Sequence, residues 1–290
     1  MIVNTLSRDL LERIQQHARA WRLVVEDVFE TETSAIASVT RDAQPLVLKV
    51  VKQQGDEWHS GKVLEAFAGN GVARVYKQAP GAMLIERLRP GNSLVSLALN
   101  GKDEKATNIL AAVMQKMSAP EVPVLCATTQ DWARGFDRYI ASGDIQISRH
   151  LVESGQRVYS DLSASQRRVR LLHGDLHHYN VLYDSDRGWL AIDPKGVAGE
   201  LEYEVGAVLR NPFERPDLFA SASTVERRLK QFTSILNLDF ERALAWGFAQ
   251  AVLSAIWEIE DGSQVDSTNP ALGLAHVIQP MLEEHGRIQA

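Results

Sequence analysis

The densest group of reactive side chains in the sequence lies at residues 173–180. This segment reads HGDLHHYN, contains Asp175 and Asn180, and is flanked by the apolar runs RLL and VLY. Asp193 ends a further apolar run, WLAID. Acidic and amide groups on loops that follow strands are well placed to reach into a cleft. Lys49 lies far upstream inside PLVLKVV, where a buried ammonium without a partner would be very costly, so it must face water or a partner.

Together these four residues provide the groups that phosphoryl transfer requires. Its transition state is loose and highly charged, so catalysis depends mainly on positioning and electrostatics. A strand lysine such as Lys49 can hold the α and β phosphates, and Asn180 with Asp193 can bind Mg²⁺, which prefers oxygen ligands. Asp175 can orient an acceptor hydroxyl and take its proton. The occurrence of all four in this order, rather than any one of them, favours a phosphotransferase.

His173 and His177, with Asp175 between them, allow a second interpretation. Two histidines four residues apart on a helix can bind zinc together with a carboxylate, which would indicate a metal-dependent hydrolase. Gly174 and the strand-like flanks favour a loop instead, and this argues against zinc. Each histidine alone is more often a hydrogen-bonded structural residue.

The residues that surround these groups predict two kinds of architecture in one chain. Before residue 88, helical spacing of leucines and β-branched runs separated by turns predict helices at 5–20 and 56–68 and strands at 23–29, 34–40, 45–51, 72–78 and 81–88. After it, the pattern becomes helical at 102–117, 128–141, 145–162, 223–236, 238–260 and 269–285. A hairpin of 181–184 with 189–193 interrupts these helices.

The fold class that follows is α+β with two lobes. We expect residues 1–88 to form a small β-rich nucleotide-binding N-lobe, and residues 89–290 to form a larger, mainly helical catalytic and substrate-binding C-lobe. A short hinge would join the two lobes, and the composition becomes helical after Arg89-Pro90-Gly91. A cleft at such a boundary is a common place for a small ligand.

Composition excludes several classes of protein. The 290 residues include 31 Lys and Arg against 37 Asp and Glu, a net charge of −6, which argues against a nucleic-acid partner. One cysteine excludes an intrachain disulfide framework and a multi-thiolate zinc site. No signal peptide is evident, and the longest apolar stretch, 243–257, is shorter than the roughly 18 residues of a membrane span. We therefore expect a cytoplasmic protein that does not associate with membranes.

Over nearly its whole length the sequence resembles the aminoglycoside/hydroxyurea antibiotic resistance kinases, and among them the streptomycin 6-kinases. The resemblance lies in the segments PLVLKV, LEAFAGNGVARV, MLIERLRPGNSL, HGDLHHYNVL, WLAIDPKGVAGE and IWEIEDG. It implies the two-lobed protein-kinase-like fold, with ATP and Mg²⁺ as cofactors. It also implies that Asp175 is the catalytic base, Asn180 and Asp193 are magnesium ligands, and Lys49 binds phosphate.

Further nucleotide contacts follow from the same resemblance. The backbone of Glu86 to Leu88 would meet adenine, with Met83 or Leu88 bordering the base, and His173 would be structural. In this family the strand lysine, here Lys49, pairs with a carboxylate. That partner would lie on the helix predicted at 56–68, which is inserted between two strands and whose buried face is defined by Val63, Leu64 and Phe67. Glu57 lies closer to that face than Glu65, so we prefer Glu57.

The sequence departs from the family at the segment that covers the phosphates. Residues 31–37 contain no glycine, although glycine lets backbone amides approach phosphate closely. Thr33 and Ser34 can donate hydrogen bonds in its place. This departure motivates one alternative function, a nucleotide-binding module with little turnover.

Acidic residues near the C-terminal end suggest the nature of the substrate. Glu258, Glu260 and Asp261 end a helix, where the helix dipole disfavours negative charge, and such a conflict can mark a functional site. Glu204 takes the second acidic position of a family motif after Asp193. These four acids are candidates for binding a cationic amine or guanidinium. For Trp132, Trp246 and Trp257, packing in the core is the better interpretation.

The function predicted from the sequence is ATP-dependent transfer of the γ-phosphoryl group to a hydroxyl of a streptomycin-like aminoglycoside, giving antibiotic resistance. The partner would be a small, cationic, hydroxyl-bearing molecule, bound by a monomer or a homodimer. The same chemistry on an amino sugar, a hydroxyurea-like compound or another small metabolite is the first alternative.

Overall fold

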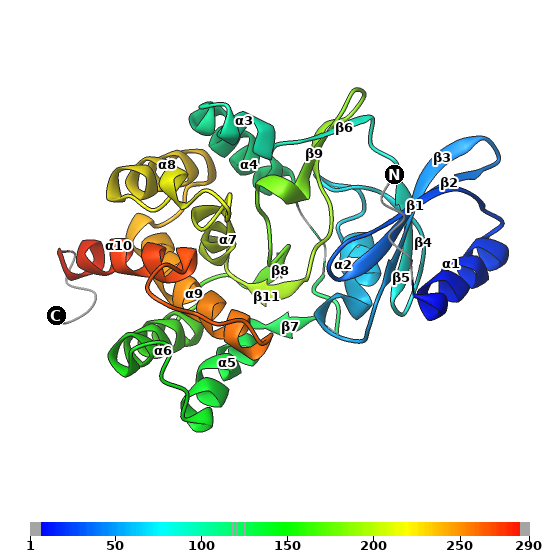
Figure 1. Ribbon diagram of the computed structural model, residues 1–290. Helices are drawn as coiled ribbons and strands as arrows, with labels where there is room; N and C mark the ends of the chain where they lie inside the picture. Colours follow the sequence, from blue (N-terminus) through cyan, green and yellow to red (C-terminus); the bar gives the residue numbers. More distant parts are fainter. Residues whose placement is uncertain (1–6, 118, 120, 125, 285–290) are drawn as a thin grey trace.

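A computed structural model describes residues 7–284 except 118, 120 and 125, and its N-terminal part is built on a five-stranded antiparallel sheet. The strand order is β1-β2-β3-β5-β4 (Figure 1). The strands are β1 (Val24–Glu30), β2 (Ser34–Arg41), β3 (Gln44–Val51), β4 (Val75–Ala79) and β5 (Ala82–Glu86). Their positions agree with the predicted strands.

The two faces of this sheet have different partners because side chains alternate along a strand. Leu46, Leu48 and Val50 of β3 pack with α1 (Arg8–Trp21), which presents Leu10 and Ile14 to the outer face (Figure 1). Val47 and Lys49 lie on the other face. That face is turned toward the rest of the molecule, so the register of β3 places Lys49 in the cleft.

The inserted helix begins as a single 3-10 turn, η1 (Asp56–His59), and continues as α2 (Ser60–Ala66). Val63, Leu64 and Phe67 are buried, as predicted. They belong to the same core cluster as the C-terminal helices. Val63 packs directly on Gly196, because a Cβ built there would lie 2.6 Å from a Val63 methyl carbon.

The rest of the chain forms a helical lobe with short strands. Its helices are α3 (Val95–Leu99), α4 (Asp103–Lys116), α5 (Thr129–Ser142), α6 (Arg149–Ala164), α7 (Val205–Leu209), α8 (Ala222–Leu236), α9 (Phe240–Glu260) and α10 (Pro270–Glu284), with the 3-10 turns η2 (His178–Asn180), η3 (Leu201–Glu204) and η4 (Pro216–Leu218). Its strands are β6 (Pro90–Ser93), β7 (Ala127–Thr128), β8 (Arg170–Leu172), β9 (Val181–Asp184), β10 (Gly188–Ala191) and β11 (Val197–Gly199). The predicted helices are confirmed apart from shifts at their ends. Residues 1–6 and 285–290, which include the start of the first predicted helix and the end of the last, lie outside the described residues.

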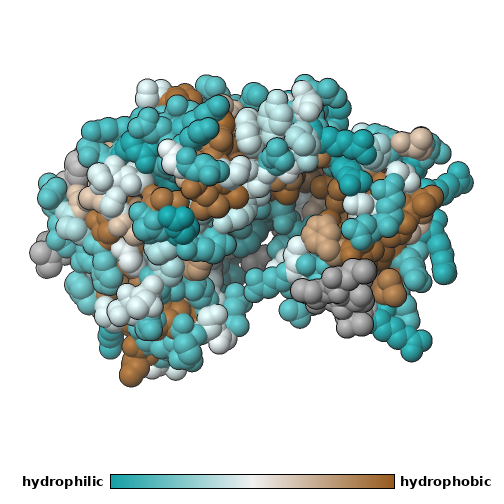
Figure 2. Space-filling model, turned by 45° about the horizontal axis from the view of Figure 1, so that its top comes forward, coloured by the Kyte–Doolittle hydropathy of each residue, from teal (hydrophilic) through white to brown (hydrophobic). Residues whose placement is uncertain are grey.

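The predicted hairpin is confirmed as the antiparallel pair β9 and β10. β6 adds to β9, so the sheet β10-β9-β6 lies where the chain enters the helical lobe. In the space-filling view, the surface is hollowed between the larger helical lobe and the smaller lobe that carries α1 to β5 (Figure 2). The structure therefore has the predicted α+β, two-lobed architecture.

The hydrophobic cores do not separate at residue 88. One cluster contains α1 with β2, β3 and β5, whereas the larger cluster joins Leu64, Phe67 and Ile85 to the C-terminal helices. A boundary between residues 88 and 89 thus stays a prediction. None of the described helices is long and apolar enough to cross a membrane.

Candidate active site

Lys49 of β3 makes a side-chain contact between the two lobes. Its Nζ lies 2.7 Å from Oε2 of Glu57 and also contacts Oδ1 of Asp193, which is 144 residues away in the chain. The lysine is buried, so these two carboxylates balance its charge. The structure thus brings Glu57, rather than Glu65, to the lysine. Burial raises the pKa of Asp193, although the adjacent ammonium of Lys49 acts in the opposite direction.

The glycine-free loop between β1 and β2 is held by its own hydroxyl groups. The backbone N–H of Ser34 donates to Oγ1 of Thr31 at 3.1 Å. The hydroxyls of Thr33 and Ser34 donate to Oε2 of Glu57 at 3.3 and 3.4 Å. Thr33 and Ser34 therefore lie beside the carboxylate that contacts Lys49, which is where phosphate-binding groups are expected.

The segment that contains Asp175 is a loop that continues into η2 (His178–Asn180). Gly174 has φ +80°, and an added Cβ would lie 2.8 Å from the Trp132 ring, so both backbone conformation and space require glycine. His173 is fully buried. Its Nε2 pairs with the carbonyl oxygen of Ile192 at 2.8 Å, and its Nδ1 accepts from the backbone N–H of Asp175 at 3.3 Å. Burial lowers the pKa of His173 to about 4, so this residue is a neutral structural member of the loop.

These contacts exclude His173 from the zinc site considered above, because both of its ring nitrogens are used. Among the described residues, no group of three or more histidine, cysteine, aspartate and glutamate side chains is arranged to hold a metal ion. The metal-dependent hydrolase is therefore not supported.

Asp175 is surrounded by nitrogen-bearing side chains. Lys195 Nζ lies 3.6 Å from its Oδ2, His177 Nε2 lies 3.7 Å from the same oxygen, and Arg210 Nη2 lies 3.8 Å from Oδ1. Burial would raise the pKa of Asp175, but Lys195, His177 and Arg210 hold it well below its usual value. Asp175 is thus an ionised hydrogen-bond acceptor.

Asn180 and Asp193 have the donor atoms that Mg²⁺ prefers. The amide nitrogen of Asn180 donates to the backbone oxygen of Asp175 at 2.9 Å, which leaves the amide oxygen as a ligand. The backbone N–H of Ile192, next to Asp193, donates to the backbone oxygen of Asn180 at 2.9 Å. An amide and a carboxylate oxygen from adjacent segments fit a hard cation.

Glu204 lies beneath the catalytic loop instead of facing a substrate. Its two carboxylate oxygens accept the backbone N–H groups of His173 at 2.7 Å and Gly174 at 3.0 Å. It is almost fully buried, and burial raises its pKa to about 7. This position differs from the predicted substrate contact, because both oxygens serve the loop.

A pocket of about 280 Å³ is lined in part by Lys195, whose Nζ lies 3.6 Å from Oδ2 of Asp175. It is lined by Trp132, Arg138, Lys195, Trp257, Glu260 and Asp261. Two of the predicted substrate-binding acids, Glu260 and Asp261, thus reach one pocket with Lys195. Trp132 and Trp257 also line it, with their rings edge to face at 5.6 Å, and both are half-buried and pack against the large hydrophobic core, as predicted.

The acidic side chains in and near this pocket differ in whether they already have a hydrogen-bond or ion-pair partner within the protein. Arg138 binds Glu260 through two bonds, from Nε at 2.7 Å and Nη2 at 2.8 Å. Glu258 is not among the lining residues, and its Oε2 accepts from Asn269 at 2.8 Å. Asp261 is exposed at the helix end. The predicted packing of Trp246 in the core is confirmed, since it is fully buried.

The predicted adenine-binding segment is fixed by side-chain contacts. The carboxylate of Glu86 pairs with Arg187 of the turn between β9 and β10, and its Oε1 also accepts the backbone N–H of Arg74 at 2.7 Å. Leu88 and Met83 are buried, and Met83 lies opposite Lys49 in the β3–β5 ladder. The backbone at 86–88 therefore borders the cleft that contains Lys49.

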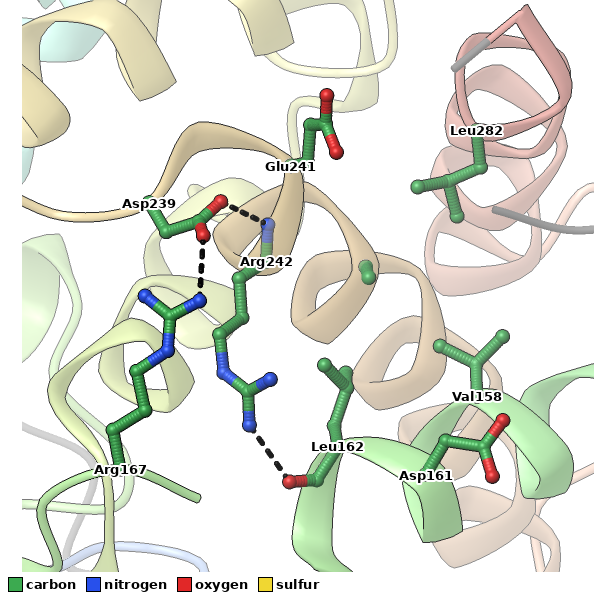
Figure 3. Close-up of a pocket in the computed structure, with 9 residues that line it drawn as sticks. Val158, Asp161, Leu162, Arg167, Asp239, Glu241, Arg242 and Leu282 are labelled. Atoms are coloured by element: carbon green, nitrogen blue, oxygen red, sulfur yellow. Dashed lines mark hydrogen bonds and ion pairs between the residues drawn. The ribbon is translucent and has the colours of Figure 1, made fainter. Parts of the chain in front are cut away.

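A second pocket, of about 140 Å³, lies between α6, α9 and α10 and contains none of these residues. Figure 3 shows contacts among its lining residues: Arg167 pairs with Asp239 at 3.3 Å, and Arg242 donates to the Leu162 carbonyl at 2.8 Å. Arg242 also pairs with the buried Glu200. These contacts are structural.

Comparison with known proteins agrees with this geometry. The family model for aminoglycoside/hydroxyurea antibiotic resistance kinases matches residues 20–262. The chain belongs to this family. It is 34% identical to streptomycin 3''-kinase of Klebsiella pneumoniae over 249 residues, which cover 83% of this chain and 91% of that protein. It is 28% identical to streptomycin 6-kinase of Streptomyces glaucescens over 89% of this chain and 83% of that protein. The chain is thus an aminoglycoside-kinase relative and a phosphotransferase.

The fold is also that of known kinases in this group. A thermostable mutant of aminoglycoside phosphotransferase APH(4)-Ia, solved with ADP and hygromycin B, superimposes with a TM-score of 0.64 at 15% identity. The match covers 93% of this chain and 97% of the other. It confirms the predicted protein-kinase-like fold.

Lys195 and Arg210 were not recognised from the sequence. Lys195 lies in the segment IDPKG, which was used to recognise the family but not to place the side chain. Arg210 follows α7, a helix too short for its periodicity to be detected.

Proposed function

We propose that this protein transfers the γ-phosphoryl group of ATP to a hydroxyl of a streptomycin-like aminoglycoside. The observation that carries this proposal is the convergence of Lys49, Glu57 and Asp193 across the cleft, with Asp175 beside a pocket that contains acidic and aromatic side chains. The streptomycin kinases to which the chain is similar support the acceptor class. Transfer to hydroxyurea, which the family description also names, is the second candidate.

In this mechanism the chain's own residues bind, orient and neutralise. Lys49 keeps its pair with Glu57 and exchanges Asp193 for the α and β phosphates, and Thr33 and Ser34 donate hydrogen bonds to phosphate oxygens. Asn180 and Asp193 would hold Mg²⁺, which supplies charge neutralisation of the phosphates. Asp175 accepts a hydrogen bond from the acceptor hydroxyl. Because the pKa of Asp175 is low, it is a weak base and takes the proton only as the new oxygen–phosphorus bond forms.

The acceptor is tested by measuring ADP release from purified protein with ATP and Mg²⁺. Streptomycin, hydroxyurea and an amino sugar are compared, and we expect streptomycin to stimulate ADP release most. Mapping the phosphate on the product by NMR then identifies the hydroxyl. An absence of stimulation by every acceptor would contradict the proposal, and binding of streptomycin without turnover would favour the nucleotide-binding module.

A substitution of the catalytic carboxylate tests the assigned chemistry. Asp175→Ala should abolish transfer, because it removes the group that orients the hydroxyl, and should leave ATP binding almost intact. ATP affinity is measured by calorimetric titration, and folding by thermal melting. Equal loss of ATP binding and transfer would contradict the assignment and indicate a structural role for Asp175.

A further inference from the structure

Lys195 lies between the catalytic carboxylate and the pocket described above. Its Nζ is 3.6 Å from Oδ2 of Asp175, and its side chain is 34% exposed and lines the pocket beside Trp132 and Trp257. Within the described part of the chain, the carboxylate that lies within 4.0 Å of the Lys195 ammonium is that of Asp175. The ammonium thus faces the place where an acceptor held by Asp175 meets the phosphoryl group.

Arg210, the second cation at Asp175, has a different environment. It is buried, donates from Nη1 to the side-chain oxygen of Gln250 at 3.4 Å, and does not line the pocket. Its Nη2 lies on the other carboxylate oxygen, 3.8 Å away. Arg210 therefore positions Asp175, whereas Lys195 is accessible to a ligand.

We propose that Lys195 is a further catalytic residue, whose ammonium contacts the phosphoryl group while it passes from ATP to the acceptor. This inference rests on the proposed function. A lone pair of the acceptor oxygen forms the bond to the γ-phosphorus while the bond to the β–γ bridging oxygen breaks, and ADP leaves with that electron pair. The hydroxyl proton passes to Asp175. Lys195 exchanges no atom or electron, and neutralises charge on the transferred oxygens.

The distances make this contact possible. An acceptor hydroxyl that donates to Asp175 lies about 2.7 Å from a carboxylate oxygen. The ammonium of Lys195 is already 3.6 Å from that carboxylate, so it is a neighbour of the attacking oxygen and of the group being transferred. Lysine has a flexible stem and three donors, which allows it to follow the moving phosphoryl group.

Steady-state kinetics distinguish this role from a structural one. Lys195→Met should lower kcat for streptomycin phosphorylation by about 100-fold, as loss of a donor to transition-state charge does elsewhere, with the KM for ATP and the melting temperature unchanged. Lys195→Arg keeps the charge and should recover part of the rate. Lys230→Met is the control: this lysine lies on α8, where its Nζ pairs with Glu226 at 2.6 Å, and activity should be unchanged.

A binding measurement gives a second readout. ADP with aluminium fluoride and streptomycin mimics the phosphoryl group in transfer, and Lys195→Met should weaken binding of that combination by about 100-fold while ADP alone binds normally. Retention of kcat in Lys195→Met, or parallel loss of ADP binding and stability, would overturn the proposal for Lys195 alone. Failure of the unsubstituted protein to phosphorylate any acceptor would overturn the proposed function, and this inference with it.

Discussion

Glu204 is a single buried carboxylate on which the shape of the catalytic loop depends. Both of its oxygens accept backbone N–H groups, from His173 and Gly174. Those amides lie directly before Asp175, so Glu204 fixes the backbone that carries the proposed catalytic carboxylate. The cost is the burial of a charge, which raises its pKa to about 7.

The raised pKa predicts a specific pH dependence of stability. The folded-state pKa of Glu204 lies above its ordinary value of 4.5, so protonation favours the folded state. Its contribution to the free energy of unfolding is fully present below pH 4.5, and is lost as the pH rises to about 7. Glu204→Gln does not titrate. The stability advantage of the unsubstituted protein over the variant should therefore shrink between these pH values, by up to about 3 kcal/mol.

Urea unfolding of both proteins at a series of pH values measures this difference. Other titrating groups, including His173, contribute equally to both proteins and cancel. A difference that is constant with pH would show that Glu204 keeps the same charge throughout. If the stability advantage of the unsubstituted protein instead grew with pH, the pKa of Glu204 would be lowered by folding rather than raised.

Contacts that depend on a local sequence pattern could be predicted, and contacts that depend on which way a side chain faces in the folded protein could not. Lys49 and Asp193 lie in recognisable strand contexts, and Glu57 follows from helical periodicity. Glu204 and Glu258 also look like exposed acids in the sequence. Only the packing of η3 and α9 reveals that Glu204 accepts hydrogen bonds from the loop before Asp175, and that Glu258 accepts one from Asn269.

Among the elements, the turn between β9 and β10 connects the two lobes. Arg187 in this turn pairs with Glu86, and its Nη2 donates to the carbonyl of Gly69 at 2.6 Å. Asp184 accepts the backbone N–H of Arg89 at 2.9 Å, and the N–H of Ser185 donates to the Arg89 carbonyl at 2.7 Å. The hairpin thus fixes the segment predicted to meet adenine on both of its sides.

Removal of the contacts made by Arg187 should weaken the binding of the nucleotide more than the binding of the acceptor. Arg187→Met deletes the contacts to Glu86 and Gly69. We expect this change to weaken the free energy of ATP binding by about 1–2 kcal/mol and so to raise the KM for ATP by roughly tenfold. The KM for streptomycin should change little. Initial rates with each substrate varied in turn give both values. Asp186→Ala, an exposed position in the same turn, is the matched control.

An equal rise in both KM values would indicate a general loss of structure and would contradict the assignment of this turn to the nucleotide side. Unchanged values would show that the hinge is held without Arg187.

Among the helices, length decided which ones could be predicted. Helices with several turns, such as α5 and α9, show their periodicity clearly. The helices α3 and α7 contain five residues each, which is less than two helical turns, and the strand β11 contains three, fewer than the four or more that reveal an alternating pattern. The helix predicted from residue 145 begins at Arg149, because Ser148 caps it by accepting the N–H of Leu151.

For the molecule as a whole, α2 extends the large core of the helical lobe into the N-terminal lobe. Val63, Leu64 and Phe67 pack with residues of the C-terminal helices, and Val63 lies against Gly196 of the loop after Asp193. The sequence placed a change of composition near residue 88 and therefore suggested a division there. Core continuity is a tertiary property that composition along the chain does not show.

This continuity predicts that the protein unfolds in one cooperative transition. Calorimetry of the full chain should give equal calorimetric and van't Hoff enthalpies. Val63→Ala should cost about 1–3 kcal/mol and lower the single melting temperature by several degrees without splitting the peak, since α2 shares its core with the helical lobe. Leu11→Ala, at an exposed position of α1, should leave the melting temperature nearly unchanged. Two separate transitions would contradict a shared core, and would instead make residues 1–88 an independent folding unit.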